Sequence, residues 1–264
     1  METRAFSFMN VPIRSEKPRE TGITMMVDMG LGVAKQRDIL DIGGAYIDLG
    51  KIAVGLSGVI SERLVKEKIK LYSDYQVETF IGGQFLEYGI YHQGLKVAHK
   101  YFEEAKRLGF KVIEVSDNNL EITLEEKFEL IRMGREDFGL KILGEVGTKT
   151  EVTSSDAMVR DIENCLSAGA WKVFVEAAEL VDKTDGSLLV EVIDAIVKAI
   201  GFKEIIFELP GPWISNVRTC DIHDMQVFLF SQFGPEINVA NVSPDDIMEL
   251  ETLRMGVGSV LDKS

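Results

Sequence analysis

The segment AGAWKVFVE, residues 168–176, contains the pattern on which the fold prediction rests. Gly169 follows an amphipathic stretch and can take the left-handed conformation that often ends a helix. The next residues, 172–175 (KVFV), are mostly β-branched or aromatic, as in a buried strand. Glu176 follows them directly. The segment therefore predicts the end of a helix, a short buried strand and a carboxylate at the carboxyl end of that strand.

The same order of helix stop and short β-rich run recurs along the chain from residue 21 onward. Amphipathic stretches such as residues 94–108 separate the runs, with apolar residues three or four positions apart. Alternating strands and helices form parallel sheets with right-handed crossovers. Eight such units in 264 residues are typical of one closed barrel. The eight predicted strands are residues 23–28, 45–51, 77–81, 111–116, 140–146, 172–176, 204–208 and 236–240.

We therefore predict an α/β fold: a single (β/α)8 TIM barrel with parallel strands over residues 21–264, preceded by an N-terminal arm, residues 1–20. An open, doubly wound sheet would carry a glycine-rich phosphate loop after its first strand. Here the first predicted strand is followed by Met29-Gly30-Leu31-Gly32, which lacks the full dinucleotide-binding pattern.

The charge balance limits the classes of partner. The chain has 29 basic and 43 acidic residues, a net charge of -14. This excess repels nucleic acids and anionic membranes, so we expect neither as a partner. No apolar run approaches the length of a membrane span and the first residues do not resemble a signal peptide. The two cysteines, Cys165 and Cys220, suit a reducing compartment, so we expect a cytoplasmic protein.

Carboxylates follow several predicted strands at the barrel end where active sites of this fold lie. Glu114, Glu145, Glu176 and Glu208 each follow an apolar β-rich run. Converging carboxylates repel one another and need a cation, and Mg²⁺ prefers a few carboxylates with water and substrate oxygens. We predict these four as Mg²⁺ ligands, with the last three, on successive strands, as the core of the site. Other strand-end acids, such as Asp117, are equally explained as helix caps.

Two lysines accompany these acids after the second and fifth predicted strands, Lys51 and Lys149. Desolvation at a barrel mouth lowers the pKa of a lysine and suits it to act as an acid, a base or a Schiff-base former. We predict both as catalytic. A structural ion pair with a neighbouring carboxylate is the alternative for each.

Taken together, the strand-end segments resemble the phosphosulfolactate synthase family, in one register from about Arg19 to Arg254. The matching segments include Tyr46-Ile-Asp48 with Lys51, Glu114-Val-Ser-Asp117, Glu145-Val-Gly147 with Lys149, Phe207-Glu208, Asn238-Val-Ala-Asn241 and Leu250-Glu-Thr-Leu-Arg254.

The resemblance implies a TIM barrel that adds sulfite to phosphoenolpyruvate with Mg²⁺, in coenzyme M biosynthesis. It implies a Michael-type addition in which Lys149 protonates C3 of the enolate after sulfite attacks C2. It also implies small anionic substrates and a homo-oligomer. From the strand-end positions and the matching segments we expect substrate binding by Arg19, Asp28, Ser57, Gln84, Ser116, Asn241 and Arg254.

The chain departs from the family pattern at positions that would hold anions. Met29 stands where the family has lysine, Leu56 and Gln84 where it has threonine, and Ala178 where it has arginine, while Asn118 replaces a glycine. A different enoate acceptor is therefore one alternative, and a non-catalytic, stress-related member of the family is another. A third is an aldolase that forms a Schiff base on Lys149 or Lys51.

Overall fold

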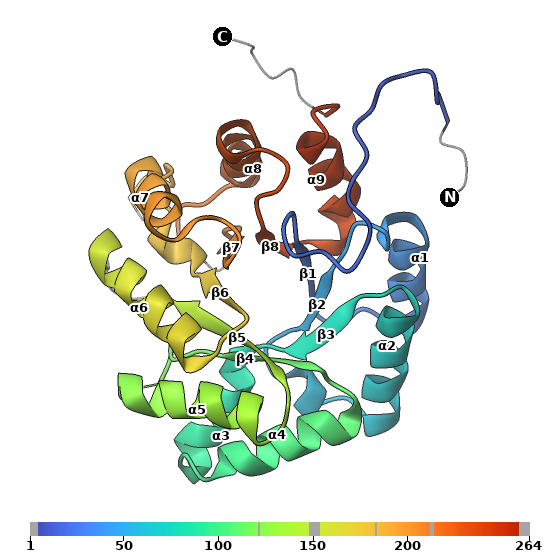
Figure 1. Ribbon diagram of the computed structural model, residues 1–264. Helices are drawn as coiled ribbons and strands as arrows, with labels where there is room; N and C mark the ends of the chain where they lie inside the picture. Colours follow the sequence, from blue (N-terminus) through green and yellow to red (C-terminus); the bar gives the residue numbers. More distant parts are fainter. Residues whose placement is uncertain (1–4, 121, 148–153, 183, 212–213, 259–264) are drawn as a thin grey trace.

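Eight parallel strands close into one barrel in the computed structural model, which describes residues 5–120, 122–147, 154–182, 184–211 and 214–258 (Figure 1). Each strand pairs with the next along the chain, and the last returns to the first. The predicted TIM barrel is thus confirmed. The strands are β1 Thr24–Asp28, β2 Leu49–Ile52, β3 Glu78–Ile81, β4 Val112–Val115, β5 Lys141–Val146, β6 Lys172–Val175, β7 Ile205–Glu208 and β8 Val239–Val242.

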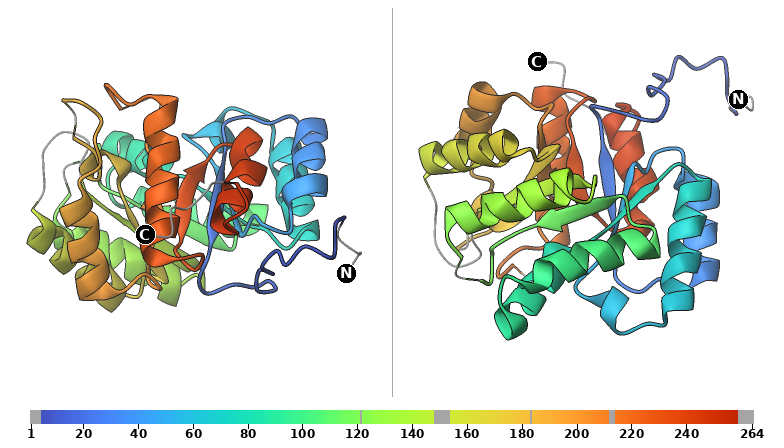
Figure 2. Two further views of the ribbon diagram at one scale, coloured as in Figure 1. Left: turned by 90° about the horizontal axis from the view of Figure 1, so that it is seen from above. Right: turned by 60° about the horizontal axis from the view of Figure 1, so that its bottom comes forward.

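Helices surround the barrel and cover the outer face of the sheet (Figures 1 and 2). The connection from β3 to β4 contains two of them, whereas β1 and β2 are joined by one. Of the described helices, none combines the length and the apolar character needed to cross a bilayer. The α-helices are α1 Val33–Gly43, α2 Glu62–Asp74, α3 Gly83–Gln93, α4 Val97–Leu108, α5 Leu124–Glu136, α6 Ser155–Ala168, α7 Val190–Ile200, α8 Thr219–Phe233 and α9 Ile247–Arg254; the 3-10 turns are η1 Leu56–Gly58, η2 Ala177–Glu179 and η3 Pro244–Asp246.

Local sequence signals set several helix ends. Gly169, in the segment quoted first, ends α6 with a φ of 108°, the left-handed conformation expected of it. At the start of α5, the Thr123 side chain accepts from the backbone N–H of Glu126, and the Glu126 carboxylate accepts from the backbone N–H of Thr123, which forms a capping box.

The core has two layers, inside and outside the strands. One apolar cluster fills the barrel and includes Leu143 on β5, Phe174 on β6 and Ile206 on β7. A larger cluster lies between the strands and the helices. Because side chains alternate along a strand, the residues two positions after the inner cluster also point inward. This alternation positions the candidate site.

Two strands begin clearly later than predicted, whereas the other strands agree with the prediction to within one residue at each end. The second strand begins at Leu49, so Asp48 lies at its amino end, where its carboxylate accepts from the Thr24 backbone N–H at 3.0 Å. The eighth strand begins at Val239, so Asn238 precedes it. The Asn238 amide accepts from Ile23 N–H and donates to backbone carbonyls near the start of β7. Both polar residues thus cap strand beginnings rather than line the opposite end of the barrel.

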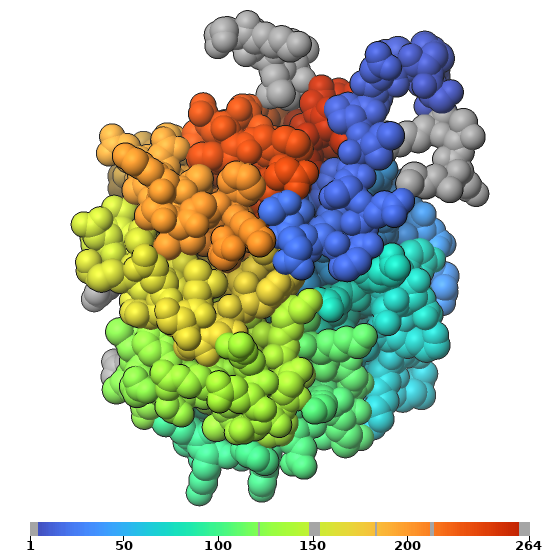
Figure 3. All heavy atoms as spheres, in the orientation of Figure 1, coloured from blue at the N-terminus to red at the C-terminus, as the bar shows by residue number. Residues whose placement is uncertain are grey.

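The segment before β1 lies against the amino end of the barrel. Arg14 forms a buried ion pair with Glu251 of α9, 2.6 Å between Nη1 and Oε2. Lys17 donates to the backbone carbonyl of Gly44 at 2.6 Å. Figure 3 shows this blue segment on the face of the molecule next to the red α9. It contains no helix or strand between residues 5 and 23.

Candidate active site at the carboxyl ends of the strands

A layer of charged side chains lies directly above the apolar core of the barrel. On or directly after each of four consecutive strands, a glutamate stands two residues after an inward-facing apolar residue and therefore points the same way. Lys51 follows Leu49 on β2 by the same spacing. All four carboxylates are nearly inaccessible, at most 4% exposed. The pairs are Val112 with Glu114, Leu143 with Glu145, Phe174 with Glu176 and Ile206 with Glu208.

This layer forms the floor of a cavity of about 360 Å³. The cavity has two chemically distinct sides. The strands β4 to β7 contribute the four glutamates, whereas β1, β2 and the residues after them contribute mainly apolar side chains and Lys51. The apolar side consists of Val27, Met29, Ala53 and Val54, and the remaining lining residues are Gly82, Gly83, Gln84 and Asn241.

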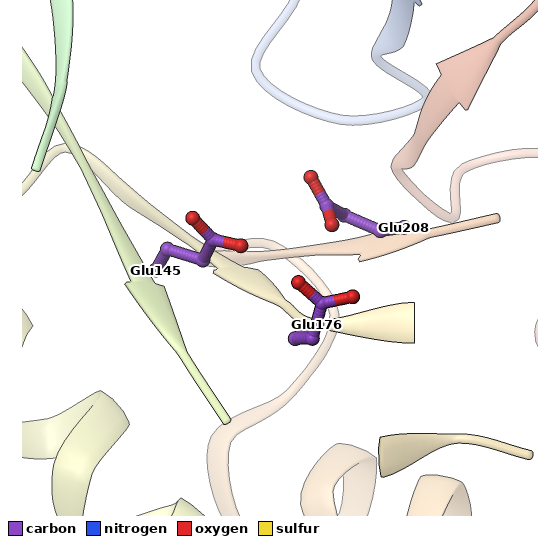
Figure 4. A group of neighbouring side chains, drawn as sticks. All are labelled: Glu145, Glu176 and Glu208. Atoms are coloured by element: carbon purple, nitrogen blue, oxygen red, sulfur yellow. The ribbon is translucent and has the colours of Figure 1, made fainter. Parts of the chain in front are cut away.

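Three of the carboxylates could hold a metal ion. Glu145, Glu176 and Glu208 each offer an oxygen, and these oxygens lie within 4.8 Å of one another. Their side chains converge from three neighbouring strands (Figure 4). Among the described residues, the buried Oε1 of Glu208 has no hydrogen-bond partner. A buried set of oxygen donors with an unsatisfied member is the environment that a hard cation stabilises.

Lys51 and Glu114 form an ion pair beside this cluster. The distance from Lys51 Nζ to Glu114 Oε2 is 2.8 Å, and that to Glu208 Oε1 is 3.6 Å. Burial opposes the charge of Lys51, but the carboxylates of Glu114, Glu208 and Glu145 outweigh it and raise its pKa. Lys51 therefore keeps its proton, contrary to the lowered pKa that the strand-end position suggested.

The pKa values of two glutamates are raised as well, which favours their neutral forms, whereas a raised pKa favours the charged form of Lys51. Burial raises the pKa of Glu114 to about 8, with Lys51 opposing this change and Glu145 adding to it. Burial also raises the pKa of Glu208 well above its usual range, and Glu145, Glu176 and Glu114 add to the effect against the opposition of Lys51. One cation does not balance four carboxylates, so the layer retains protons at neutral pH unless a further cation is bound.

Glycine lets α3 begin close to this layer. A Cβ atom on Gly83 would lie 2.2 Å from Ser116 Oγ and 3.2 Å from Glu114 Oε1. Any side chain at this position would collide with the residues after β4. The absence of a side chain therefore keeps the cavity open between β3 and β4.

Asn118 belongs to the site although its role was not expected from the sequence. Its Nδ2 lies 2.7 Å from Glu145 Oε1 and 3.3 Å from Glu176 Oε2. It donates to two of the three converging carboxylates from the loop that joins β4 to α5. The signal in the sequence was an amide at a position where the family pattern has glycine.

The structure brings only some of the other predicted site residues to the cavity. Gln84 and Asn241 line the cavity. Ser116 donates to the buried Glu87. Ser57 lies in η1 and is not among the residues lining the cavity. Lys149 belongs to residues 148–153, which lie outside the described residues.

Asp28 has structural partners that occupy its carboxylate. Lys68 Nζ lies 2.7 Å and Tyr72 Oη 2.8 Å from its Oδ2, and the backbone N–H groups of Gly30 and Leu31 donate to its Oδ1. All of these contacts link β1 to the loop that follows it and to α2.

The two predicted arginines lie at the amino end of the barrel, away from the cavity. Arg19 donates to Asp48, just before β2, at 2.9 Å. Arg254 donates to the carbonyl of Ile237, before β8, at 2.7 Å and to Thr24 Oγ1 at the start of β1 at 3.1 Å. The structure does not bring either arginine to the cavity.

Comparison with known proteins agrees with this architecture. Residues 12–259 match the family model described as (2R)-phospho-3-sulfolactate synthase (ComA). Phosphosulfolactate synthase of Methanothermobacter thermautotrophicus is 35% identical over 98% of both chains. The enzyme of the same name from Methanocaldococcus jannaschii is 33% identical over 90% of this chain and 92% of its own. Among solved structures, the YdjI aldolase of Escherichia coli K12 shares the fold, with a TM-score of 0.57 at 13% identity over 90% of this chain and 88% of its own.

Proposed function

Since the chain belongs to the phosphosulfolactate synthase family, we propose that it is a lyase that forms a carbon–sulfur bond by adding sulfite to phosphoenolpyruvate. One observation carries the proposal. In a chain of this family, three buried carboxylates converge at the floor of the cavity, where a bound Mg²⁺ would be held by Glu145, Glu176 and Glu208.

The family description supports a different regiochemistry from the one expected above. A product named phospho-3-sulfolactate carries its sulfur on C3, not on C2. The lone pair of the sulfite sulfur therefore attacks C3, and the electrons of the C2–C3 double bond move toward C2 and the carboxylate. A proton then adds to C2, and the phosphate stays on its oxygen. No group leaves, so atoms and charge balance with one proton taken up.

The charge that develops on the substrate carboxylate is the part of this reaction that needs stabilising. When bound, Mg²⁺ would supply Lewis-acid stabilisation of that charge. Lys51 adds a fixed positive charge, because Glu114 and Glu208 hold its ammonium group in place. Such preorganised charge is worth more in a buried site than in water.

The proton at C2 needs a separate donor. Lys51 is a poor one, because the neighbouring carboxylates raise its pKa. Lys149, which follows β5, is the donor that we propose on the resemblance to the family. Lys51 and Lys149 then have different roles, the first electrostatic and the second as general acid.

Turnover tests this function directly. The purified protein is incubated with phosphoenolpyruvate, sulfite and Mg²⁺, and the sulfonate product is followed by mass spectrometry. We expect product from the wild type and at least a hundredfold less from Lys149→Ala, the typical contribution of a general acid. The absence of product from folded protein that binds Mg²⁺ would contradict phosphoenolpyruvate as the acceptor.

A second acceptor is favoured by the apolar side of the cavity. Met29 and Val54 line it and remain 61% and 58% exposed. Among the described lining residues, Lys51 is the one basic side chain, and it is already paired. These features suit an enoate whose remote substituent is apolar instead of a phosphate. Sulfite addition to a 2-alkyl acrylate that exceeds addition to phosphoenolpyruvate would establish this alternative.

A further inference from the structure

We propose that Asn118 is a positioning residue of the metal site, which holds the carboxylates of Glu145 and Glu176 in the orientation that a divalent cation requires. The inference rests on the metal site of the proposed function but not on the identity of the acceptor. Its basis is the pair of contacts from Asn118 Nδ2, 2.7 Å to Glu145 Oε1 and 3.3 Å to Glu176 Oε2.

The chemistry of the amide determines which of its ends faces the acids. In the ionised form that binds a metal, carboxylates accept hydrogen bonds and donate none, so an amide oxygen turned toward them would be repelled. The NH₂ end therefore faces both glutamates. Among the described residues, the opposite end, Oδ1, is buried and has no hydrogen-bond partner. The side chain thus gives up an acceptor bond in order to bridge two acids, which indicates that the bridge fixes its position.

The loop that carries Asn118 is itself held on both sides of this residue. Ser116 Oγ donates to one oxygen of Glu87, and the backbone N–H of Asn119 donates to the other at 2.9 Å. Glu87 lies on α3 and is buried. The loop therefore cannot shift away from the acids without breaking contacts to α3.

Glu145, which the Asn118 amide contacts, is also tied to the loop that carries Asn118. Lys127 on α5 pairs with Asp117 at 2.7 Å and donates to the backbone carbonyl of Glu145 at 2.6 Å. One lysine thus ties the loop residue before Asn118 to the strand residue that Asn118 contacts. Asn118 and Glu145 are held in register by shared contacts, as a positioning role requires.

Loss of the amide would remove one of the contacts that orient the carboxylates of Glu145 and Glu176 toward each other. The oxygens of Glu145 and Glu176 would then be directed less well at the point shared with Glu208. Removing a hydrogen-bond partner of a metal ligand typically weakens metal binding by about 10- to 100-fold. We expect a loss of this size in Asn118→Ala.

Binding of Mn²⁺ alone, measured by the electron paramagnetic resonance signal of the free ion, tests this role without substrate. The variants are Asn118→Ala, Asn118→Leu, which has the same branched shape but no amide, and Asn118→Gln, which keeps the amide. Asn119→Ala is the matched control, because that side chain is exposed and its backbone N–H contact to Glu87 is retained. Thermal unfolding without metal shows that each variant is folded.

We expect Mn²⁺ to bind about 10- to 100-fold more weakly to the Ala and Leu variants, with partial recovery in Asn118→Gln and no change in Asn119→Ala. Equal or tighter binding by Asn118→Ala would overturn the inference, as would a loss of binding that merely follows a loss of thermal stability. Failure of the wild type itself to bind Mn²⁺ would overturn both this inference and the metal site of the proposed function. Normal wild-type binding with unchanged variants would overturn the role of Asn118 alone.

Discussion

Lys51 on β2 and Glu114 on β4 meet above the barrel core, with 2.8 Å between Nζ and Oε2, although β3 separates their strands. The contact is possible because both residues stand two positions after an inward-facing apolar residue, Leu49 and Val112. In the described part of the cavity lining, this lysine is the one basic side chain beside four glutamates. The charge balance of the site therefore depends on it.

Removal of the lysine charge should destabilise the protein. At a pH above the Glu114 pKa of about 8, Lys51→Met leaves the ionised carboxylate of Glu114 without its cation, and breaking a buried ion pair typically costs about 3–5 kcal/mol. We expect a loss of this order in the free energy of unfolding, measured by urea denaturation without metal. Lys51→Arg is the control that retains the charge. Excess Mg²⁺ should restore part of the lost stability. A urea midpoint of Lys51→Met equal to that of the wild type would contradict this charge balance.

The metal-free protein should lose stability as the pH rises toward 8. Glu114 has a pKa raised to about 8 by burial, whereas an unfolded glutamate has a pKa near 4.3. Between these values the folded state holds a proton that the unfolded state has released. The contribution of this proton to the free energy of unfolding is therefore complete below about pH 4. It is lost as the pH rises through the folded pKa of Glu114, by up to about 1.4 kcal/mol per pH unit.

Urea unfolding in a chelator at several pH values between 5.5 and 8 would measure this slope. Glu114→Gln, which does not ionise, should show a smaller one. Saturating Mg²⁺ should also reduce the slope, because the ion binds the deprotonated carboxylates. Stability that increases with pH over this range in the metal-free protein would be inconsistent with protonated carboxylates in the layer.

Asp28 should matter for stability rather than for substrate binding. Asp28→Asn leaves the buried ammonium group of Lys68 without its carboxylate, at an expected cost of about 3–5 kcal/mol. The matched control is Asp74→Asn. It breaks an exposed ion pair with Lys70 on α2, the helix that also contains Lys68, and should cost at most about 1 kcal/mol. Equal effects of the two changes on the urea midpoint would contradict the structural role of Asp28.

A cation at the cavity mouth should change the choice of acceptor. Met29→Lys places an ammonium group on the apolar side of the cavity. We expect kcat/KM for phosphoenolpyruvate to rise about fivefold relative to a 2-alkyl acrylate, the effect of one partly screened ion pair of about 1 kcal/mol. Met9→Lys is the control, since Met9 is an exposed methionine outside the cavity. An unchanged ratio in Met29→Lys would exclude this side chain as a determinant of specificity.

The sequence was sufficient for the barrel and for the acidic layer, because both follow from a regular alternation. A glutamate directly after a buried strand shares the inward direction of the residue two positions before it, as Glu176 does with Phe174. Arg19 and Arg254 carried no such signal. A charged residue outside a strand can serve either end of the barrel, and the contacts of these two lie at the amino end.

Residues whose positions depend on contacts from distant parts of the chain were harder to predict. Asn118 lies in a loop whose position depends on Glu87 from another helix, and no local pattern links these two residues. Asp48 and Asn238 were misplaced because strand ends cannot be located to the residue when polar groups interrupt a β-rich run. Hydrogen bonds to neighbouring strands decided those boundaries.

The most direct test of the metal-dependent reaction compares two glutamates at opposite ends of one strand. Glu208 ends β7 in the acidic cluster, whereas Glu204 precedes the same strand at the amino end. Sulfonate formation from phosphoenolpyruvate, sulfite and Mg²⁺ is measured for Glu208→Gln and Glu204→Gln, together with Mn²⁺ binding. We predict that the first variant loses both metal binding and product by at least tenfold, while the second retains both. Full activity in Glu208→Gln, or no product from wild-type protein that binds the ion, would contradict the proposed synthase reaction at this cluster.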